Sequence, residues 1–266
     1  LFLTYLAMEA LEHHTGQSLQ KKISSAGKTG PIWGGLLGVI PQCGFSAAAS
    51  SLFAGRVITV GTLIAIFLST SDEMLPIFLS EAVPVSTIVK ILGTKVVIAV
   101  ISGFIVEFIY HFTLHRKDED MDIEVVCEEE HCSCKDGLFV AALKHTLRIF
   151  VYIFIISLIL NLVIGMIGED NLASLFSSLP VVGEAVAALI GLIPNCASSV
   201  VITQLYLDGI IGAGPMMAGL LVNSGVGLLI LCRLNRHVKE NAAIIGSVYA
   251  LGLIWGIIIE FTGIVF

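Results

Sequence analysis

Eight long apolar stretches follow one another along this 266-residue chain, and they constrain its fold more than any other feature. Apolar residues make up 56% of the sequence and charged residues 13%, about half the share that is usual in soluble domains. Stretches of this length and composition predict an all-α polytopic membrane protein. They cover 1–12, 31–53, 57–80 and 87–111 in the first half, and 141–167, 184–206, 209–233 and 241–266 in the second.

Charged residues are concentrated between the two sets of apolar stretches. The segment 115–137 carries nine acidic and three basic residues, which accounts for six of the seven net negative charges. A segment of this composition is typical of a solvated linker. We therefore divide the chain into a first membrane repeat over 1–114, an acidic linker over 115–137 and a second membrane repeat over 138–266.

Several classes of protein are excluded by the charge and by missing motifs. The net charge is −7 and the sequence has no basic stripe, which argues against nucleic-acid binding. No Walker A, G-x-S-x-G or H-E-x-x-H pattern occurs. We therefore expect no ATP hydrolysis, no other enzymatic activity and no bound cofactor. Leu1 already lies in an apolar run, so we expect further residues to precede it.

The two halves align without a gap when the sequence is shifted by 153 residues. About 25 of the 85 positions from Ser24 to Phe108 are then identical. The segment 38–43 (GVIPQC) lies over 191–196 (GLIPNC), and Glu107 lies over Glu260. This self-similarity indicates an internal duplication.

Corresponding loops in the two halves carry opposite charge. The loop 12–30 contains three lysines, whereas its counterpart 168–183 contains two acidic residues. The loop around Glu81 is acidic, whereas its counterpart contains Arg233, Arg236 and Lys239. Because basic loops stay on the cytoplasmic side, this pattern predicts two repeats of inverted topology and a cytoplasmic linker.

Inversion requires an odd number of crossings in each half, but each half has four apolar stretches. One stretch per half must therefore enter and leave on the same side of the membrane. The stretches that contain Pro41 and Pro194 are the candidates, because a proline in the middle of a helix breaks it. We predict re-entrant hairpins over 31–53 and 184–206, so that each repeat has three spanning helices and one hairpin, with about ten hydrophobic segments in total. An ordinary kinked span is the alternative for either hairpin.

The hairpin tips are the predicted place for a substrate site. Irregular backbone at membrane depth is tolerated where it lines a cavity, and sites in inverted-repeat transporters lie near the midplane. Each tip has one cysteine, and thiolates bind soft metal species; the alternative is that both cysteines are small buried residues without a ligand. The predicted substrate-binding residues are Gln42, Cys43, Ser46, Asn195, Cys196 and Ser199 at the tips, with Asn223 and Ser224 from a following polar cluster.

Asp72 and Glu73 interrupt the third apolar stretch of the first half. A carboxylate inside a membrane is expensive and is a candidate functional group. We predict that these two residues carry a coupling proton, and that Asp72 also ligates a metal. The alternative is that this cluster reaches the external interface and is solvated.

The linker has a second group of metal-binding side chains. Cys127, His131, Cys132 and Cys134 could together hold one soft cation, although their spacing is not that of a standard zinc site. A solvated linker without a metal is the alternative.

Four segments resemble a known family. They are 41–47 (PQCGFSA), 69–76 (STSDEMLP), 191–199 (GLIPNCASS) and 219–225 (GLLVNSG). Together they are similar to a bacterial family of ten-transmembrane heavy-metal exporters, described variously as arsenic efflux proteins or manganese transporters, and more distantly to organoarsenical permeases. The resemblance implies efflux of a metal or metalloid. A single Cys43 stands where the permeases often have more than one cysteine.

We therefore predict a secondary transporter that exports a heavy-metal or metalloid species, coupled to protons, as a multi-pass protein of the bacterial inner membrane. Its expected partners are the lipid bilayer and the transported ion, and the sequence leaves a homodimer open. The alternative function is a carrier for a small organic solute or anion in which the cysteines are structural. Lys90 and Lys95, which lie in a predicted span, bear on that alternative.

Overall fold

The computed structural model describes residues 29–39, 43–71, 74–113, 151, 155, 158, 181–194, 196–235, 237–264 and 266. All regular secondary structure in these residues is α-helical, and four of their segments are long and apolar enough to cross a membrane. The predicted all-α class is confirmed, and the four candidate spans agree with a polytopic membrane protein. The stretch 1–12, the acidic linker and most of 141–167 lie outside the described residues.

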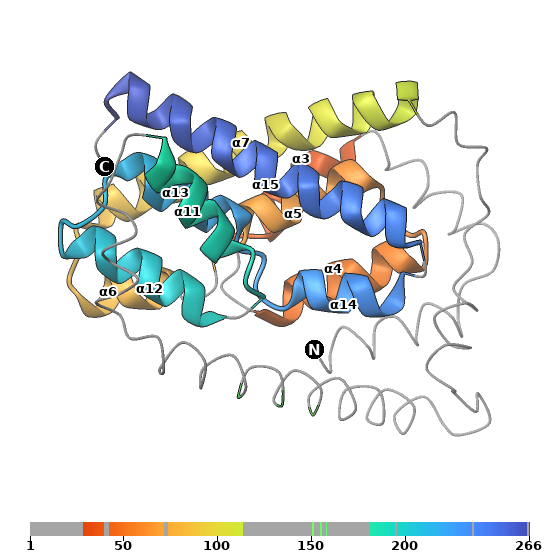
Figure 1. Cartoon of the computed structure of the whole chain (residues 1–266), viewed down its shortest axis with the longest axis horizontal. Helices are drawn as coiled ribbons and strands as arrows, with labels where there is room; N and C mark the ends of the chain where they lie inside the picture. Colours follow the sequence, from red (N-terminus) through yellow and green to blue (C-terminus); the bar gives the residue numbers. More distant parts are fainter. Residues whose placement is uncertain are drawn as a thin grey trace.

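The described helices form two sets of the same design (Figure 1). From the second helix of each set onward, every helix of the second set begins 153 residues after its counterpart in the first. This interval is the one that aligns the two halves of the sequence. The first set is α3 (Gly30–Leu37), α4 (Cys43–Ala54), α5 (Val60–Ser69), α6 (Met74–Ser80) and α7 (Val85–Thr113), and the second is α11 (Val182–Gly191), α12 (Cys196–Leu207), α13 (Ala213–Val222), α14 (Gly227–Leu234) and α15 (Val238–Thr262).

Two of the four candidate spans are broken midway. The span 60–80 is divided between α5 and α6, and the span 213–234 between α13 and α14. Every residue of α5 and almost every residue of α13 is buried. A helix that is apolar all round belongs in the interior of a larger bundle, so these two half-helices form the centre of the molecule.

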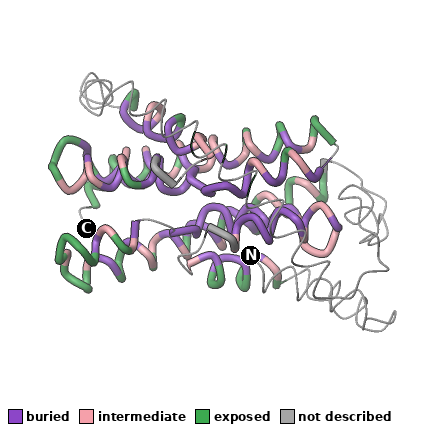
Figure 2. The backbone as a smooth tube through the Cα atoms, turned by 90° about the horizontal axis from the view of Figure 1, so that it is seen from below, coloured by how far each residue is buried: buried purple, intermediate pink, exposed green. Residues whose placement is uncertain are grey.

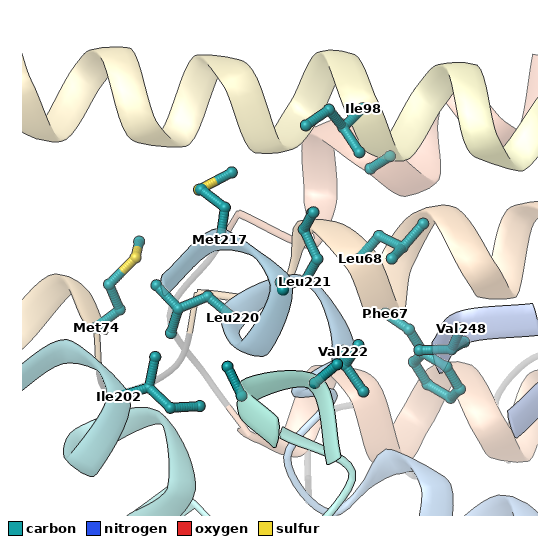
Figure 3. Packing of buried hydrophobic residues seen from close by; sticks show 14 of the residues in the cluster. Phe67, Leu68, Met74, Ile98, Ile202, Met217, Leu220, Leu221, Val222 and Val248 are labelled. Carbon is teal, nitrogen blue, oxygen red and sulfur yellow. The ribbon is translucent and has the colours of Figure 1, made fainter. Parts of the chain in front are cut away.

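The other helices surround this centre. Helix α3 packs on α5 and α11 packs on α13, whereas α4 packs on α14 and α12 on α6, across the two sets. Buried side chains such as Phe67, Leu221 and Val248 fill the interior (Figure 3). Figure 2 shows the backbone of the buried residues in purple. The long helices α7 and α15 expose large apolar side chains such as Phe108 and Phe261, which are 71% and 81% exposed. These outer faces are suited to contact with lipid.

A glutamate from each long helix caps the start of a central helix. The Gly61 N–H donates to Glu107 Oε2 at 2.8 Å, and the Gly214 N–H donates to Glu260 Oε2 at 3.0 Å. Each glycine is the second residue of its helix, so its N–H has no partner within that helix. A carboxylate at this position also complements the positive end of the helix dipole. The two symmetric glutamates therefore fix α5 to α7 and α13 to α15.

Replacing Glu107 with leucine should leave the Gly61 N–H unsatisfied. We expect Glu107→Leu to lower the free energy of unfolding by about 1–3 kcal/mol, whereas Glu107→Gln, which keeps an acceptor oxygen, should lower it by less than about 1 kcal/mol. Thermal unfolding of the purified protein in detergent measures both values. Equal losses in the two variants would mean that the hydrogen bond is not what holds this contact.

Candidate functional site

The first helix break is held by hydroxyl groups. After Ser69 the backbone leaves the helix at Thr70, whose Oγ1 donates to Ile66 O at 2.8 Å. Ser71 then donates from Oγ to Val39 O at 2.7 Å. Val39 follows α3 and directly precedes the segment that contains Pro41. The break in the span is therefore bonded to the chain next to the proline motif of the same half.

The second helix break is held by the side-chain amide of Asn223. Asn223 Oδ1 accepts the Gly225 N–H at 2.8 Å, which forms a tight turn, and Gly225 takes a φ of 57° that suits glycine. Asn223 Nδ2 donates to Ser198 Oγ at 2.9 Å, and Ser198 Oγ donates to Ile193 O at 3.2 Å. Ile193 precedes Pro194. Both breaks are therefore tied to the proline motif of their own half, through different side chains.

Lys95 joins the two breaks. Its side chain is completely buried, and its Nζ donates to Thr70 O, at the end of α5, and to Leu220 O, in the last turn of α13, the latter at 3.0 Å. Carbonyl groups in the last turn of a helix lack partners within that helix and carry its partial negative charge. The ammonium group lies where the negative ends of two helices from different halves meet.

A small polar pocket adjoins this junction. It has room for about one water molecule, far less than a small-molecule site needs. Met74, Leu220 and the nearby Ile202 bring apolar side chains from three helices to this region (Figure 3). A ligand larger than a few atoms would require the halves to move apart. The pocket is lined by Thr70, Ser71, Met74, Lys95, Ser199, Leu220 and Asn223.

The structure brings two of the predicted substrate-binding residues, Ser199 and Asn223, into this pocket. Ser224 is buried beside Asn223, and its hydroxyl has no hydrogen-bond partner among the described residues. Ser46 is buried elsewhere: it packs against Gly227, where α4 meets α14, and it does not line this pocket. Pro194 is half-buried, between α11 and α12.

The other predicted site residues are not described. Cys43 and Cys196 begin α4 and α12, but their side chains lie outside the description. Among the described residues, no three His, Cys, Asp or Glu side chains form a metal-binding group. The predicted residues that lie outside the described ranges altogether are Pro41, Gln42, Asp72, Glu73, Asn195, Cys127, His131, Cys132 and Cys134.

Five of the pocket residues were not among the predicted site residues: Thr70, Ser71, Met74, Lys95 and Leu220. Lys95 offered a clear signal, because a charged residue in the middle of the apolar stretch 87–111 is a functional candidate by default. Its counterpart in the second half is Val248, so the duplication gave no support for it. Met74 offered no signal, because an apolar residue in an apolar stretch is expected in any core.

A second polar contact joins the halves at one end of the molecule. Arg56, in the turn before α5, donates from both Nη atoms to the two carboxylate oxygens of Glu240, each at 3.1 Å. Two further groups donate to the same carboxylate: Tyr110 Oη donates to Glu240 Oε1 at 2.7 Å, and Asn235 Nδ2 donates to Glu240 Oε2 at 3.0 Å. The two charged side chains are only 15% and 8% exposed. Residues of both halves therefore share one largely buried carboxylate.

A family model described as "Putative, 10TM heavy-metal exporter" matches the chain twice, over residues 2–124 and over residues 108–259. The two matches together cover almost the whole chain, one for each half. This confirms the resemblance that the four sequence segments indicated. Comparisons with curated proteins and with solved structures found no match.

Removing the Ser198 hydroxyl should weaken the tie between the second break and the proline motif. We expect Ser198→Ala to lower the free energy of unfolding by about 1–3 kcal/mol, because the buried Asn223 amide loses its acceptor. Ser247→Ala is the matched control, since that hydroxyl is exposed and bonds only within α15, to Ala243 O; its effect should stay within about 0.5 kcal/mol. Thermal unfolding compares the two, and equal effects would contradict a role for Ser198 as a tie.

Reversing one charge of the pair between Arg56 and Glu240 should destabilise the contact between the halves. We expect Arg56→Glu to lower the free energy of unfolding by about 3–5 kcal/mol, and addition of Glu240→Arg to restore at least half of the loss. The exposed neighbour offers a control, Lys239→Glu, with an effect within about 0.5 kcal/mol. A double variant no more stable than Arg56→Glu would show that the pair does not hold this end together.

Proposed function

Because the chain belongs to the family of ten-transmembrane heavy-metal exporters, we propose that it is a secondary transporter that moves a heavy-metal or metalloid species out of the cytoplasm. The observation that carries this proposal is the junction of two broken spans. α5 and α13 both stop in the buried centre, next to a polar pocket that residues of both halves line. Broken helices that meet in this way are the usual frame of a substrate site in such transporters.

Contacts along α3 support the proposed re-entrant hairpins. A Cβ at Gly30 would touch Thr62, near the start of α5, and one at Gly38 would touch Ser69, at its end. Helix α3 therefore runs parallel to α5. The end of α4 leads through a short turn, 55–59, to the start of α5. The chain thus enters α3 and leaves α4 at the same end of the bundle, as a re-entrant hairpin requires.

Two observations support inverted repeats. Helices α7 and α15 run in opposite directions in Figure 1. Trp255 Nε1 donates to Ser102 Oγ at 2.9 Å, and these two residues occupy equivalent positions in the repeats. Equivalent residues touch each other where a twofold axis passes between them. We propose that this axis lies in the membrane plane.

The polar contact at Glu240 supports an orientation in the membrane. The start of α5, the end of α7 and the start of α15 meet at this end, and Arg56, Arg233 and Lys239 belong to it. On the positive-inside rule, we propose that this end, and the linker that follows α7, lie on the cytoplasmic side of a bacterial inner membrane. The counterparts of Arg56 and Glu240 in the repeat are Gly209 and Thr87, so no such ion pair recurs at these positions. We propose that the pair closes the cytoplasmic side in this arrangement.

Within the site, we propose that Ser199, Asn223 and Ser224 provide oxygen ligands, with Gln42 and Asn195 from the hairpin tips. Cys43 and Cys196 follow the tips directly and would bind a soft metal or metalloid through thiolate. We propose Ser46 as a further contact when the halves move, since it lies where α4 meets α14. Asp72 and Glu73 would carry the coupling proton, as they follow the first break. Pro41 and Pro194 would keep the tips from becoming helical.

The buried charge of Lys95 favours a second candidate function, transport of a small anion or anionic solute. Two unit charges 4 Å apart interact by about 4 kcal/mol at an effective dielectric constant of 20. A bare divalent cation in the pocket would therefore be repelled by the ammonium group, and an anion attracted. A metalloid that travels as a neutral or anionic oxygen species would agree with both the lysine and the family.

Replacing the two motif cysteines should separate these alternatives. In proteoliposomes, we expect a variant with Cys43→Ser and Cys196→Ser to lose at least about tenfold in flux of arsenite, methylarsenite or Cd²⁺, because hydroxyl groups bind soft species poorly. The control is Cys232→Ser, a free and exposed cysteine whose loss should leave the flux unchanged. Zn²⁺, Mn²⁺ and small organic anions complete the panel.

The other outcomes distinguish between the proposed ligands and between the two candidate functions. Unchanged flux of the soft species in the double variant would contradict thiolate ligation. Flux of Mn²⁺ that does not depend on the cysteines would move the ligands to the oxygen side chains. Flux of an organic anion and of none of the metals would overturn the proposed export of metal in favour of the second candidate.

A further inference from the structure

The junction of α5 and α13 has the features of a cation-binding site. Two backbone carbonyl oxygens, Thr70 O and Leu220 O, point to one place from the C-terminal ends of two helices. Each oxygen lies at the negative end of a helix dipole, between the apolar core and the polar pocket. Unwound carbonyls and C-terminal ends of half-helices coordinate alkali cations in membrane transporters.

In this structure a side chain fills that place. The Lys95 ammonium is fully buried and donates to both oxygens, one from each half of the molecule. Ser71, Ser199 and Asn223 line the adjoining pocket with further oxygen atoms. Among the described residues that line this pocket, Lys95 is the one with a charged side chain. We propose that the ends of α5 and α13 form a monovalent-cation site, and that Lys95 is a tethered cation that occupies it.

The duplication supports a specific role for this residue. The position equivalent to Lys95 is Val248, a buried residue of the core cluster, so the two halves share one ammonium. The ammonium is carried by α7 and bonds to the breaks of both halves. It therefore does in this protein what a bound alkali ion would do: it neutralises two helix ends and holds them together. The assignment does not rest on the proposed function.

The test is to empty the site and offer it a free cation. Lys95→Ala removes the ammonium and leaves space at the two carbonyls. Lys95→Met removes the charge but fills the space with an apolar chain of similar length. Both variants and the wild type are purified in detergent, and thermal unfolding is measured in NaCl, KCl, ethylammonium chloride or choline chloride at equal ionic strength. Choline is too large for the site and serves as the reference salt.

We expect the midpoint of Lys95→Ala to rise by about 3–8 °C in at least one of the three small-cation salts relative to choline, as ligand binding to the folded state requires. The wild type and Lys95→Met should change by less than about 1 °C. Equilibrium binding of ²²Na⁺ gives an independent readout, with about one ion per chain for Lys95→Ala and none for the wild type. If Lys95→Ala does not fold, Lys95→Ser, which leaves similar space, goes through the same comparison.

A response of the alanine or serine variant no larger than that of Lys95→Met, together with no ²²Na⁺ binding, would overturn the tethered-cation assignment. Neither measurement contains a transported metal. The failure of this site would therefore leave the proposed export untouched. If Lys95→Ala responds to small cations but the wild type transports no metal in proteoliposomes, the proposed function is overturned and the cation site stands.

Discussion

A helix that stops inside a bilayer leaves carbonyl and amide groups that lipid cannot satisfy, and the centre of this molecule is arranged around that constraint. Thr70 and Ser71 provide hydroxyls at the first break, and Asn223 and Ser198 provide an amide and a hydroxyl at the second. Lys95 satisfies one carbonyl from each side. The polar pocket follows from these requirements, because four of the groups that repair the two breaks also line it: Thr70, Ser71, Lys95 and Asn223.

The duplication and the departures from it have different roles. Symmetric features build the frame: Glu107 and Glu260 cap the two central helices in the same way, and the paired glycines 61 and 103 recur as 214 and 256 at the same close contact. The asymmetric features include two buried or half-buried basic residues: Lys95 has Val248 as its counterpart, and Arg56 has Gly209. A transporter needs two similar halves that pack in more than one way, and it needs unlike groups to give each arrangement its own contacts.

Much of this frame could be predicted from the sequence. Long apolar stretches identified the class, and the interval between GVIPQC and GLIPNC matches the interval between the helices. Asp72 and Glu73 were recognised as interrupting an apolar stretch, but the helix break just before them, at Thr70, was not predicted. The sequence did not indicate that α4 packs on α14, because contacts between halves leave no periodic pattern. Glu107 and Glu260 were recognised as a symmetric pair, but an interfacial glutamate and a helix cap have the same sequence signature. Lys95 was recognised as a lysine in a predicted span, but its role depends on two backbone carbonyl groups that no sequence pattern reveals.

The proposed transport function requires that the second break lie on a path that opens to each side of the membrane in turn. Ser224 is the residue to test, because its hydroxyl is buried at that break and has no hydrogen-bond partner among the described residues. The measurement is the reaction of Ser224→Cys with a membrane-impermeant thiol reagent added from either side of oriented proteoliposomes, quantified at position 224 by peptide mass spectrometry. The account predicts reaction from both sides, in a ratio that changes when the substrate gradient is reversed. Reaction from one side only, whatever the gradient, would contradict it.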